Sequence, residues 1–198
     1  MSELKVVKHN IFPTSMWIMK GAPQQLIDEL YQGVYKITEK HTGVVVSNQG
    51  GYQSPGFRWE DFHPKGKEYI KEAISNIITN QYEITGWWFN ISPKDAWNLP
   101  HTHPGSDFAL VWYLTDSDGL LTLMNDHPQR LIESGPENGH YMGVDANKGD
   151  IVIFPADIHH YVLPNKRDTD RISISLNIRI PLFDSNSKND RGRDHVIS

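Results

Sequence analysis

The sequence contains no cysteine, and this absence limits the chemistry that the chain can carry. Disulfide bonds, iron–sulfur clusters and thiolate catalysis are excluded because each of them needs a cysteine sulfur. A bound metal must therefore take its ligands from histidine, aspartate or glutamate. A chain without disulfides is also compatible with a reducing compartment, and we expect a cytoplasmic location.

Long apolar runs and an excess of positive charge are missing as well. No stretch approaches the roughly 20 apolar residues of a membrane-spanning helix, and the N-terminal sequence MSELKVVKHN lacks the apolar core of a signal peptide. The formal net charge of −5 gives no electrostatic reason to expect nucleic-acid binding. The 198 residues, 38% of them hydrophobic, are enough for one domain with a buried core and a cavity.

Two kinds of periodicity divide the sequence. Residues 23–40 and 64–81 carry apolar side chains at helical spacing, and Pro64 marks the start of the second stretch. From about residue 82 the pattern changes to short strand-forming runs separated by turn residues, which is typical of a sandwich or barrel. We therefore predict a single, mainly β domain of the α+β type. Its expected parts are helical support with an access loop (1–81), a β core (82–183) and a polar tail (184–198).

The string PHTHP places His101 and His103 two positions apart. On an extended segment two such side chains point to the same side, so both imidazoles can face one point. The flanking prolines favour an extended backbone around them. In a chain of this length with ten histidines, about 0.5 such pairs are expected by chance, so surface or loop histidines are the alternative to a metal site.

A second histidine pair, His159 and His160, follows the buried run IVIFP and a short turn. Adjacent residues of a strand point to opposite faces, so at most one of the two is a metal ligand. His160 shares its side with the apolar Ile158 and His159 with the charged Asp157, and this periodicity does not choose between them. For the other histidine we expect an ordinary structural role.

The run RISISLNIRI alternates strictly between aliphatic and polar residues. One face of this strand is therefore apolar and the other polar. Either it is an ordinary strand with one wet face, or the polar face lines a cavity where the histidines meet. Arg171 begins the polar face, and its planar guanidinium suits a carboxylate. Ser173 adds a hydroxyl donor on the same side.

Together these segments resemble a family of non-haem Fe(II), 2-oxoglutarate-dependent oxygenases known from bacteria and tailed phages. The similar pieces run in order through residues 50–178: GYQS, WWFNI, PHTHPGS, FALVWYL, GDIVIFPADIHHYVLPN and RISISLN. The resemblance implies a double-stranded β-helix, which is a jelly-roll or cupin-like fold, with the N-terminal helices supporting it. It also implies Fe(II) as the cofactor, 2-oxoglutarate and O₂ as co-substrates and, for a phage-encoded chain, the host cytoplasm as the location.

The resemblance assigns metal binding to three histidines: His101, His103 and His160. It assigns 2-oxoglutarate to Arg171 and Ser173, and Asn90 and Tyr113 are further candidates for contacts with the oxo acid. The wider superfamily has Asp or Glu where this sequence has His103. Either His103 is the third ligand, or a carboxylate such as that of Asp107 supplies it. The i, i+2 spacing favours His103.

The activity that the resemblance implies is hydroxylation of a small molecule or peptide, with release of succinate and CO₂. Two alternatives stay open. One is a three-histidine metalloenzyme that does not use 2-oxoglutarate, such as an iron dioxygenase or a zinc hydrolase. The other is a non-catalytic cupin-like binding or assembly module. A homodimer is compatible with the sequence, and a membrane partner is not expected.

Two further features near the expected site permit two interpretations each. Four aromatic residues on the predicted strands are expected in the core, with a cavity wall as the alternative: Trp87, Trp88, Trp112 and Tyr113. The glycine-rich segment 51–54, GYQS, is either a lid over a substrate or a plain connecting loop.

Overall fold

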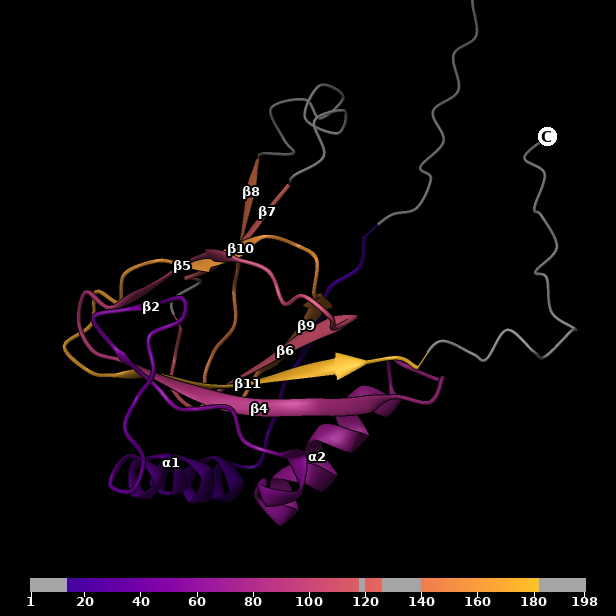
Figure 1. The fold of residues 1–198 in the computed structure, drawn as a ribbon, viewed down its shortest axis with the longest axis horizontal. Helices are drawn as coiled ribbons and strands as arrows, with labels where there is room; N and C mark the ends of the chain where they lie inside the picture. Colours follow the sequence, from indigo (N-terminus) through magenta and orange to yellow (C-terminus); the bar gives the residue numbers. More distant parts are fainter. Residues whose placement is uncertain (1–13, 118–119, 126–139, 182–198) are drawn as a thin grey trace, which may run out of the picture.

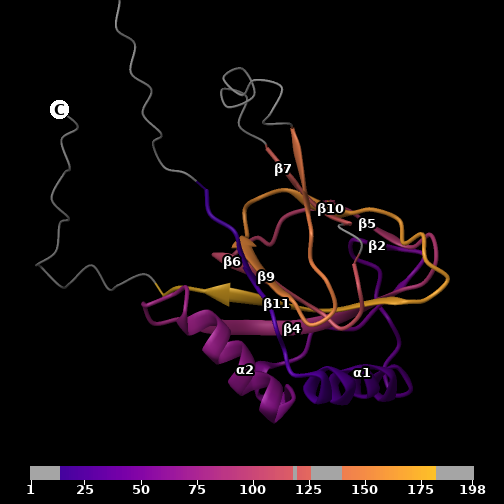
Figure 2. The same ribbon diagram turned by 180° about the vertical axis from the view of Figure 1, so that it is seen from behind.

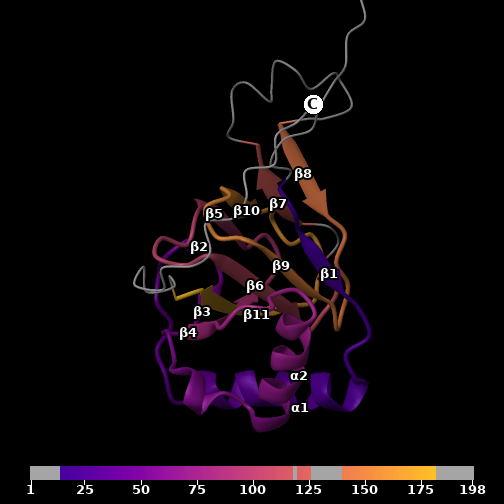
Figure 3. The ribbon, with the colours of Figure 1, turned by 90° about the vertical axis from the view of Figure 1, so that its right-hand side faces the viewer.

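The computed structural model of the chain describes residues 14–117, 120–125 and 140–181. Within these residues two antiparallel sheets face each other, and two helices cover the outer side of the larger sheet (Figure 1). Seen from the side, the helices, the larger sheet and the smaller sheet form three successive layers (Figure 3). The mainly β architecture with N-terminal helical support is therefore confirmed.

The strands that the structure describes divide into six in the larger sheet and five in the smaller one. The larger sheet has the order β1 (Trp17–Met19), β9 (Ile151–Pro155), β6 (Phe108–Tyr113), β11 (Arg171–Arg179), β4 (Glu83–Ser92), β3 (Tyr52–Gln53). The smaller sheet has the order β2 (Asn48–Gln49), β5 (Trp97–His101), β10 (His160–Val162), β7 (Leu121–Met124), β8 (Tyr141–Val144). The paired strands β7 and β8 extend away from the helices (Figure 2).

The two predicted helices are present, the second one shorter than expected. α1 (Gln24–Thr38) lies within the predicted stretch, whereas α2 (Pro64–Ser75) ends before residue 81. After Ser75 the backbone N–H groups of Ile77 and Ile78 both donate to the carbonyl of Ile74. At its start, α2 has a proline in the first turn, and the side chain of His63 accepts a hydrogen bond from the N–H of Gly66. A short 3-10 helix, η1 (Trp59–Asp61), precedes it.

β11 has the two-faced character that its sequence predicts. It pairs with β4 on one side and β6 on the other, so it lies inside the larger sheet. Its four aliphatic side chains are at most 1% exposed and pack into the core shared with α1 and α2: Ile172, Ile174, Leu176 and Ile178. Trp87 and Trp112 belong to this same core, as expected for bulky aromatic residues on strands.

A second, smaller core lies between the two sheets. Phe154 and Val152 of β9 pack there against Leu121 and Leu123 of β7. This packing holds the sheets together at one end and leaves the space at the other end to polar side chains. Within the glycine-rich segment 51–54, Tyr52 and Gln53 form β3, an edge strand of the larger sheet, so this segment is not a plain connecting loop.

The remaining sequence predictions concern the short strands, the C-terminal tail and the membrane. β1 and β8 were not predicted, whereas the strand-forming runs from residue 83 onward all contain strands. The predicted polar tail from residue 184 lies outside the described residues. None of the described helices is long and apolar enough to cross a membrane.

A pair of glycine substitutions tests the close approach of β3 to its neighbours. A Cβ at Gly51 would lie 2.8 Å from the carbonyl oxygen of Ile91, which is backbone and cannot move aside. Gly51→Ala should therefore lower the free energy of unfolding by about 1–3 kcal/mol. Gly33→Ala, in open space on α1, should raise it by about 0.5–1 kcal/mol. Urea unfolding measures both, and equal effects would contradict the packing described.

Candidate functional site

A cavity of about 350 Å³ lies between the two sheets. Its volume falls within the range of about 300–1,000 Å³ that is usual for ligand pockets. The polar face of β11 and the inward-facing residues of β4 and β6 line one side, and residues of β5 and β10 line the other. Six residues from the segments before and around β3 also contribute: Val44, Val46, Ser47, Gln53, Ser54 and Gly56. The polar face of β11 therefore lines a cavity, as one of the two sequence interpretations proposed.

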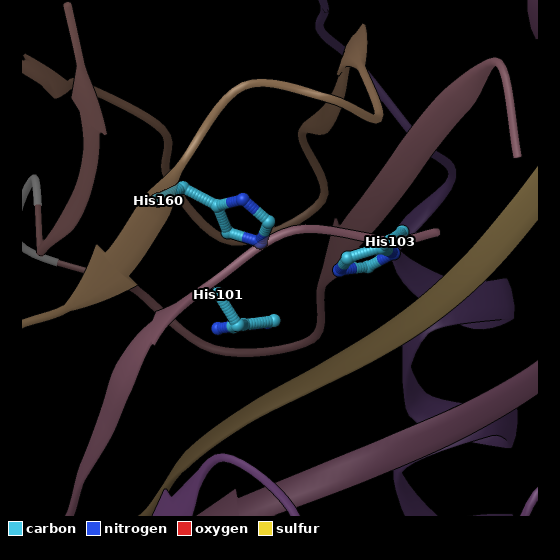
Figure 4. Close-up of side chains that lie close together, drawn as sticks. All are labelled: His101, His103 and His160. Carbon is cyan, nitrogen blue, oxygen red and sulfur yellow. The ribbon is translucent and has the colours of Figure 1, made fainter. Parts of the chain in front are cut away.

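Three histidines converge in this cavity (Figure 4). His101 ends β5, and His160 lies directly opposite it at the start of β10. His103 follows two residues after His101, where its backbone N–H donates to the carbonyl of Ala156. The ring centroids are 4.3 Å apart for His101 and His160, 5.0 Å for His103 and His160, and 5.3 Å for His101 and His103. One ring nitrogen of each lies within 4.8 Å of the others.

Each of these rings is oriented by a hydrogen bond at Nδ1. The Nδ1 atoms of His101 and His160 lie 2.7 and 2.9 Å from backbone carbonyl oxygens two residues earlier. The Nδ1 atom of His103 lies 2.6 Å from Oδ1 of Asn177 on β11. Because these oxygens only accept, each Nδ1 carries the hydrogen and each Nε2 keeps its lone pair. The arrangement therefore offers three Nε2 donors, which is how histidines bind metals.

The environment keeps the three imidazoles neutral. Burial lowers the pKa of all three, and for His160 burial together with the adjacent His101 lowers the pKa to about 3. The hydrogen bonds at Nδ1 raise the pKa of His101 and His103, but by less than burial lowers it. Neutral imidazole is the form that binds a metal ion, so no proton has to leave.

The alternative candidates for the metal ligands lie in different places in the structure. The side chain of His160 is 3% exposed and lies in the cavity, whereas His159 is exposed and outside this group. The carboxylate of Asp107 accepts a hydrogen bond from the N–H of Ile180 at 2.7 Å. The carboxylate of Asp107 therefore binds the backbone just after β11, and it is not part of the group formed by the three histidines.

The residues expected to bind the oxo acid also lie together in the cavity. Arg171 is 5% exposed, and its Nη1 donates to the carbonyl of Leu163 at 3.0 Å. Two residues further along β11, Ser173 lies opposite Asn90 on β4 and Tyr113 on β6. Burial raises the pKa of the Tyr113 hydroxyl, with Arg171 nearby opposing it, so this hydroxyl remains a donor.

Two cavity residues were part of the sequence prediction without a specific role in the site. Asn177 was visible as part of the polar face of β11, but nothing in the sequence connected it with His103. Gln53 belonged to the glycine-rich segment 51–54, but its place in the cavity follows from the pairing of β3 with β4. Of the four aromatic residues, Trp88 and Tyr113 line the cavity. They alternate with the core residues Trp87 and Trp112 along β4 and β6.

Residues 86–177 match the sequence model of a family described as "Putative 2OG-Fe(II) oxygenase". The resemblance to the 2OG-Fe(II) oxygenases is confirmed. The matched segment contains the three converging histidines together with Arg171 and Ser173. No curated protein matches the chain by sequence.

Solved structures of oxygenases share the fold. HygX from Streptomyces hygroscopicus, with nickel and 2-oxoglutarate bound, has a TM-score of 0.63 at 12% identity, covering 86% of this chain and 84% of HygX. A prolyl-4-hydroxylase from Pseudomonas putida has a TM-score of 0.59 at 15% identity, covering 84% and 93%. SnoN, an α-ketoglutarate-dependent epimerase from nogalamycin biosynthesis, has a TM-score of 0.66 at 11% identity, covering 84% and 78%. The predicted double-stranded β-helix is thereby confirmed.

The hydrogen bond between Asn177 and His103 can be tested directly. Asn177→Leu removes the acceptor that fixes the ring of His103, so the affinity of the site for Co(II) should fall by about 10–100-fold. Asn177→Asp retains an acceptor and should keep most of the affinity. Ser175→Ala, on the same face of β11, is the matched control and should bind Co(II) normally. Titration followed by the cobalt absorption bands measures all three; unchanged affinity in Asn177→Leu contradicts the role of Asn177.

Proposed function

We propose that this protein is an Fe(II)- and 2-oxoglutarate-dependent oxygenase that hydroxylates a small molecule or peptide, with release of succinate and CO₂. The observation that carries the proposal is the presence, in one cavity, of three neutral Nε2 donors and a buried arginine. The match of residues 86–177 to this oxygenase family supports the same activity.

His101, His103 and His160 are the residues that would hold Fe(II). Imidazole is a suitable ligand for iron, and one ring nitrogen of each histidine lies within 4.8 Å of the others, close enough for all three to bind one ion. Because neutral imidazoles bring no negative charge, the divalent ion would attract an anionic co-substrate strongly. HygX, which shares the fold, has been solved with iron bound and with nickel and 2-oxoglutarate bound.

Arg171 is the residue that would bind the far carboxylate of 2-oxoglutarate. Its guanidinium presents donors in a planar fork that matches a carboxylate. The bond from Nη1 to the carbonyl of Leu163 holds the side chain in one orientation. The hydroxyls of Ser173 and Tyr113, on adjacent strands, can donate to the same carboxylate.

Iron with bound 2-oxoglutarate supplies the activation of O₂ in enzymes of this class. The part of this chain is to orient the ligands and to keep water away from them. The ring of Trp88 lies 5.5 Å from that of His103, and the ring of Phe154 lies 4.8 Å from that of His160. These aromatic neighbours limit the access of water to the histidines. A three-histidine enzyme that uses no oxo acid does not need a guanidinium in its cavity, whereas 2-oxoglutarate has a carboxylate that suits Arg171, so we favour the 2-oxoglutarate-dependent activity.

The proposal predicts a spectroscopic signal before any substrate is known. Anaerobic addition of Fe(II) and then 2-oxoglutarate to the full chain should produce a weak visible charge-transfer band, and O₂ should then yield succinate. Absence of both the band and succinate contradicts the proposal. His160→Ala should abolish the band, whereas the matched variant His159→Ala, altered in the exposed neighbour, should retain it.

Substitution of Arg171 separates binding of the oxo acid from binding of the metal. Arg171→Gln loses the charge-assisted bonds to the carboxylate, so the affinity for 2-oxoglutarate should fall by about tenfold to a hundredfold. The affinity for Fe(II) should stay within about twofold, because Arg171 is not among the three converging histidines. Equal loss of both affinities, measured by calorimetry, would show that Arg171 acts on the whole site instead.

A further inference from the structure

The polar row beside Arg171 continues to the edge of the larger sheet. Ser173 lies opposite Tyr113 and Asn90, and Asn90 in turn lies opposite Gln53 on β3. All four side chains line the cavity. The row therefore extends two strands beyond β11 on the side away from Tyr113, and ends in two neighbouring side-chain amides, those of Asn90 and Gln53.

The side-chain oxygen of Asn90 needs a hydrogen-bond donor, which the oxo acid cannot supply. Its Oδ1 atom is buried and has no hydrogen-bond partner among the described residues. A buried acceptor without a donor is costly, so a site of this kind is built for a partner. At neutral pH 2-oxoglutarate has two carboxylates and a ketone, all of which only accept. A second ligand that carries an N–H or O–H group can supply the donor that the oxo acid lacks.

Gln53, on the edge strand β3, is a second side-chain amide available to a ligand. Its side chain is 8% exposed and makes no hydrogen bond to another described residue. Its backbone carbonyl accepts the N–H of Val44 at 2.9 Å, which fixes the segment 44–46 beside it. Two amides side by side offer both donors and acceptors, which is the complement of an amide group in a ligand.

The charges in the cavity favour a neutral ligand at this end. No Asp, Glu or Lys is present among the described residues that line the cavity, and its one permanent cation is Arg171. A cationic substrate would therefore lose its hydration without gaining a counter-ion. An anionic substrate would compete with the oxo acid for Arg171.

An apolar surface adjoins the two amides. Val44 and Val46 line the cavity and are 36% and 66% exposed, and Val45 between them is 82% exposed. Three consecutive valines in water are unfavourable, and an apolar group of a ligand that covered Val44 and Val46 would remove part of this exposure.

We propose that the part of the cavity formed by Gln53, Asn90, Val44 and Val46 is the substrate subsite, and that it binds an uncharged amide group with an adjoining apolar group. The proposal rests on the proposed oxygenase function. It names the substrate class as a neutral amide, such as the backbone and an aliphatic side chain of a peptide. The N–H of the amide donates to Oδ1 of Asn90, and the side-chain amide of Gln53 pairs with the carbonyl.

The test uses three derivatives of leucine that differ in charge, and each charged probe carries one of the two amide groups of the neutral one. They are N-acetyl-leucine N-methylamide, which is neutral, N-acetyl-leucine, an anion, and leucine N-methylamide, a cation. The full chain is first loaded with Ni(II) and 2-oxoglutarate, and dissociation constants are then measured by ligand-observed NMR. The neutral diamide should bind about tenfold more tightly than either charged probe, because only it avoids the cost of an unpaired charge.

Variants of Gln53 identify the place of binding. Gln53→Met should weaken binding of the diamide about fivefold, through loss of the hydrogen bonds to its amide. Gln53→Glu should reverse the order and favour the cation by about tenfold, because it supplies the missing counter-ion. Gln49→Glu makes the same change on β2 at a residue that does not line the cavity, and should leave the order unchanged.

The outcomes distinguish this inference from the proposed function. Failure to load Ni(II) and 2-oxoglutarate contradicts the oxygenase function itself. A loaded protein that binds none of the three probes, that binds charged probes as tightly as the diamide, or whose order of affinities is the same in Gln53→Glu overturns the substrate subsite alone. Thermal unfolding of each variant shows that a changed affinity does not come from a protein that has failed to fold.

Discussion

The pairing of β11 between β4 and β6 is the constraint on which both the core and the cavity depend. Side chains alternate along this strand with a period of two, so its apolar face meets the helices while its polar face meets the smaller sheet. A slip of one residue would bury Arg171 and Ser173 against the helices and turn isoleucines into the cavity. The hydrophobic packing of the helices against the larger sheet therefore also fixes the position of the polar residues of the candidate site.

The charges in the cavity favour an anionic ligand beside the metal site. The three converging imidazoles are neutral because burial lowers their pKa, and no carboxylate joins them in the described residues. A divalent ion bound there would keep its full charge. Arg171 adds a second positive group in the same cavity, so the two attractions that the site offers are both for anions. A dianion with two separated carboxylates satisfies both, and this leaves only neutral groups of the protein for any further ligand.

The periodicity of apolar residues predicted the elements that are long enough to show a regular pattern, and it missed the shortest strands. Both helices and the long strands β4 and β11 follow from regular patterns, because one face of each is buried. β1 and β8 have three and four residues, too few for an alternation to be recognised, and each pairs with a strand that the sequence did predict, β9 and β7 respectively. Parity could not choose between His159 and His160, since the choice is made by the pairing of β10 with His101 on β5. The positions of Gln53 and Asn177 in the cavity are likewise set by contacts between segments that are distant in the sequence.

His103 shows most clearly what the spacing of residues can and cannot explain. The sequence argument placed both histidines on one extended segment, yet β5 ends at His101 and His103 lies beyond it. Its position is set by two contacts with other segments: its N–H donates to Ala156, and its ring donates to Oδ1 of Asn177. The second contact suits a histidine whose hydrogen is on Nδ1, because that nitrogen donates to the amide oxygen while Nε2 keeps its lone pair for a metal ion. The histidine at position 103 is therefore held in place by residues of two other segments, and the spacing from His101 alone does not determine where its ring lies.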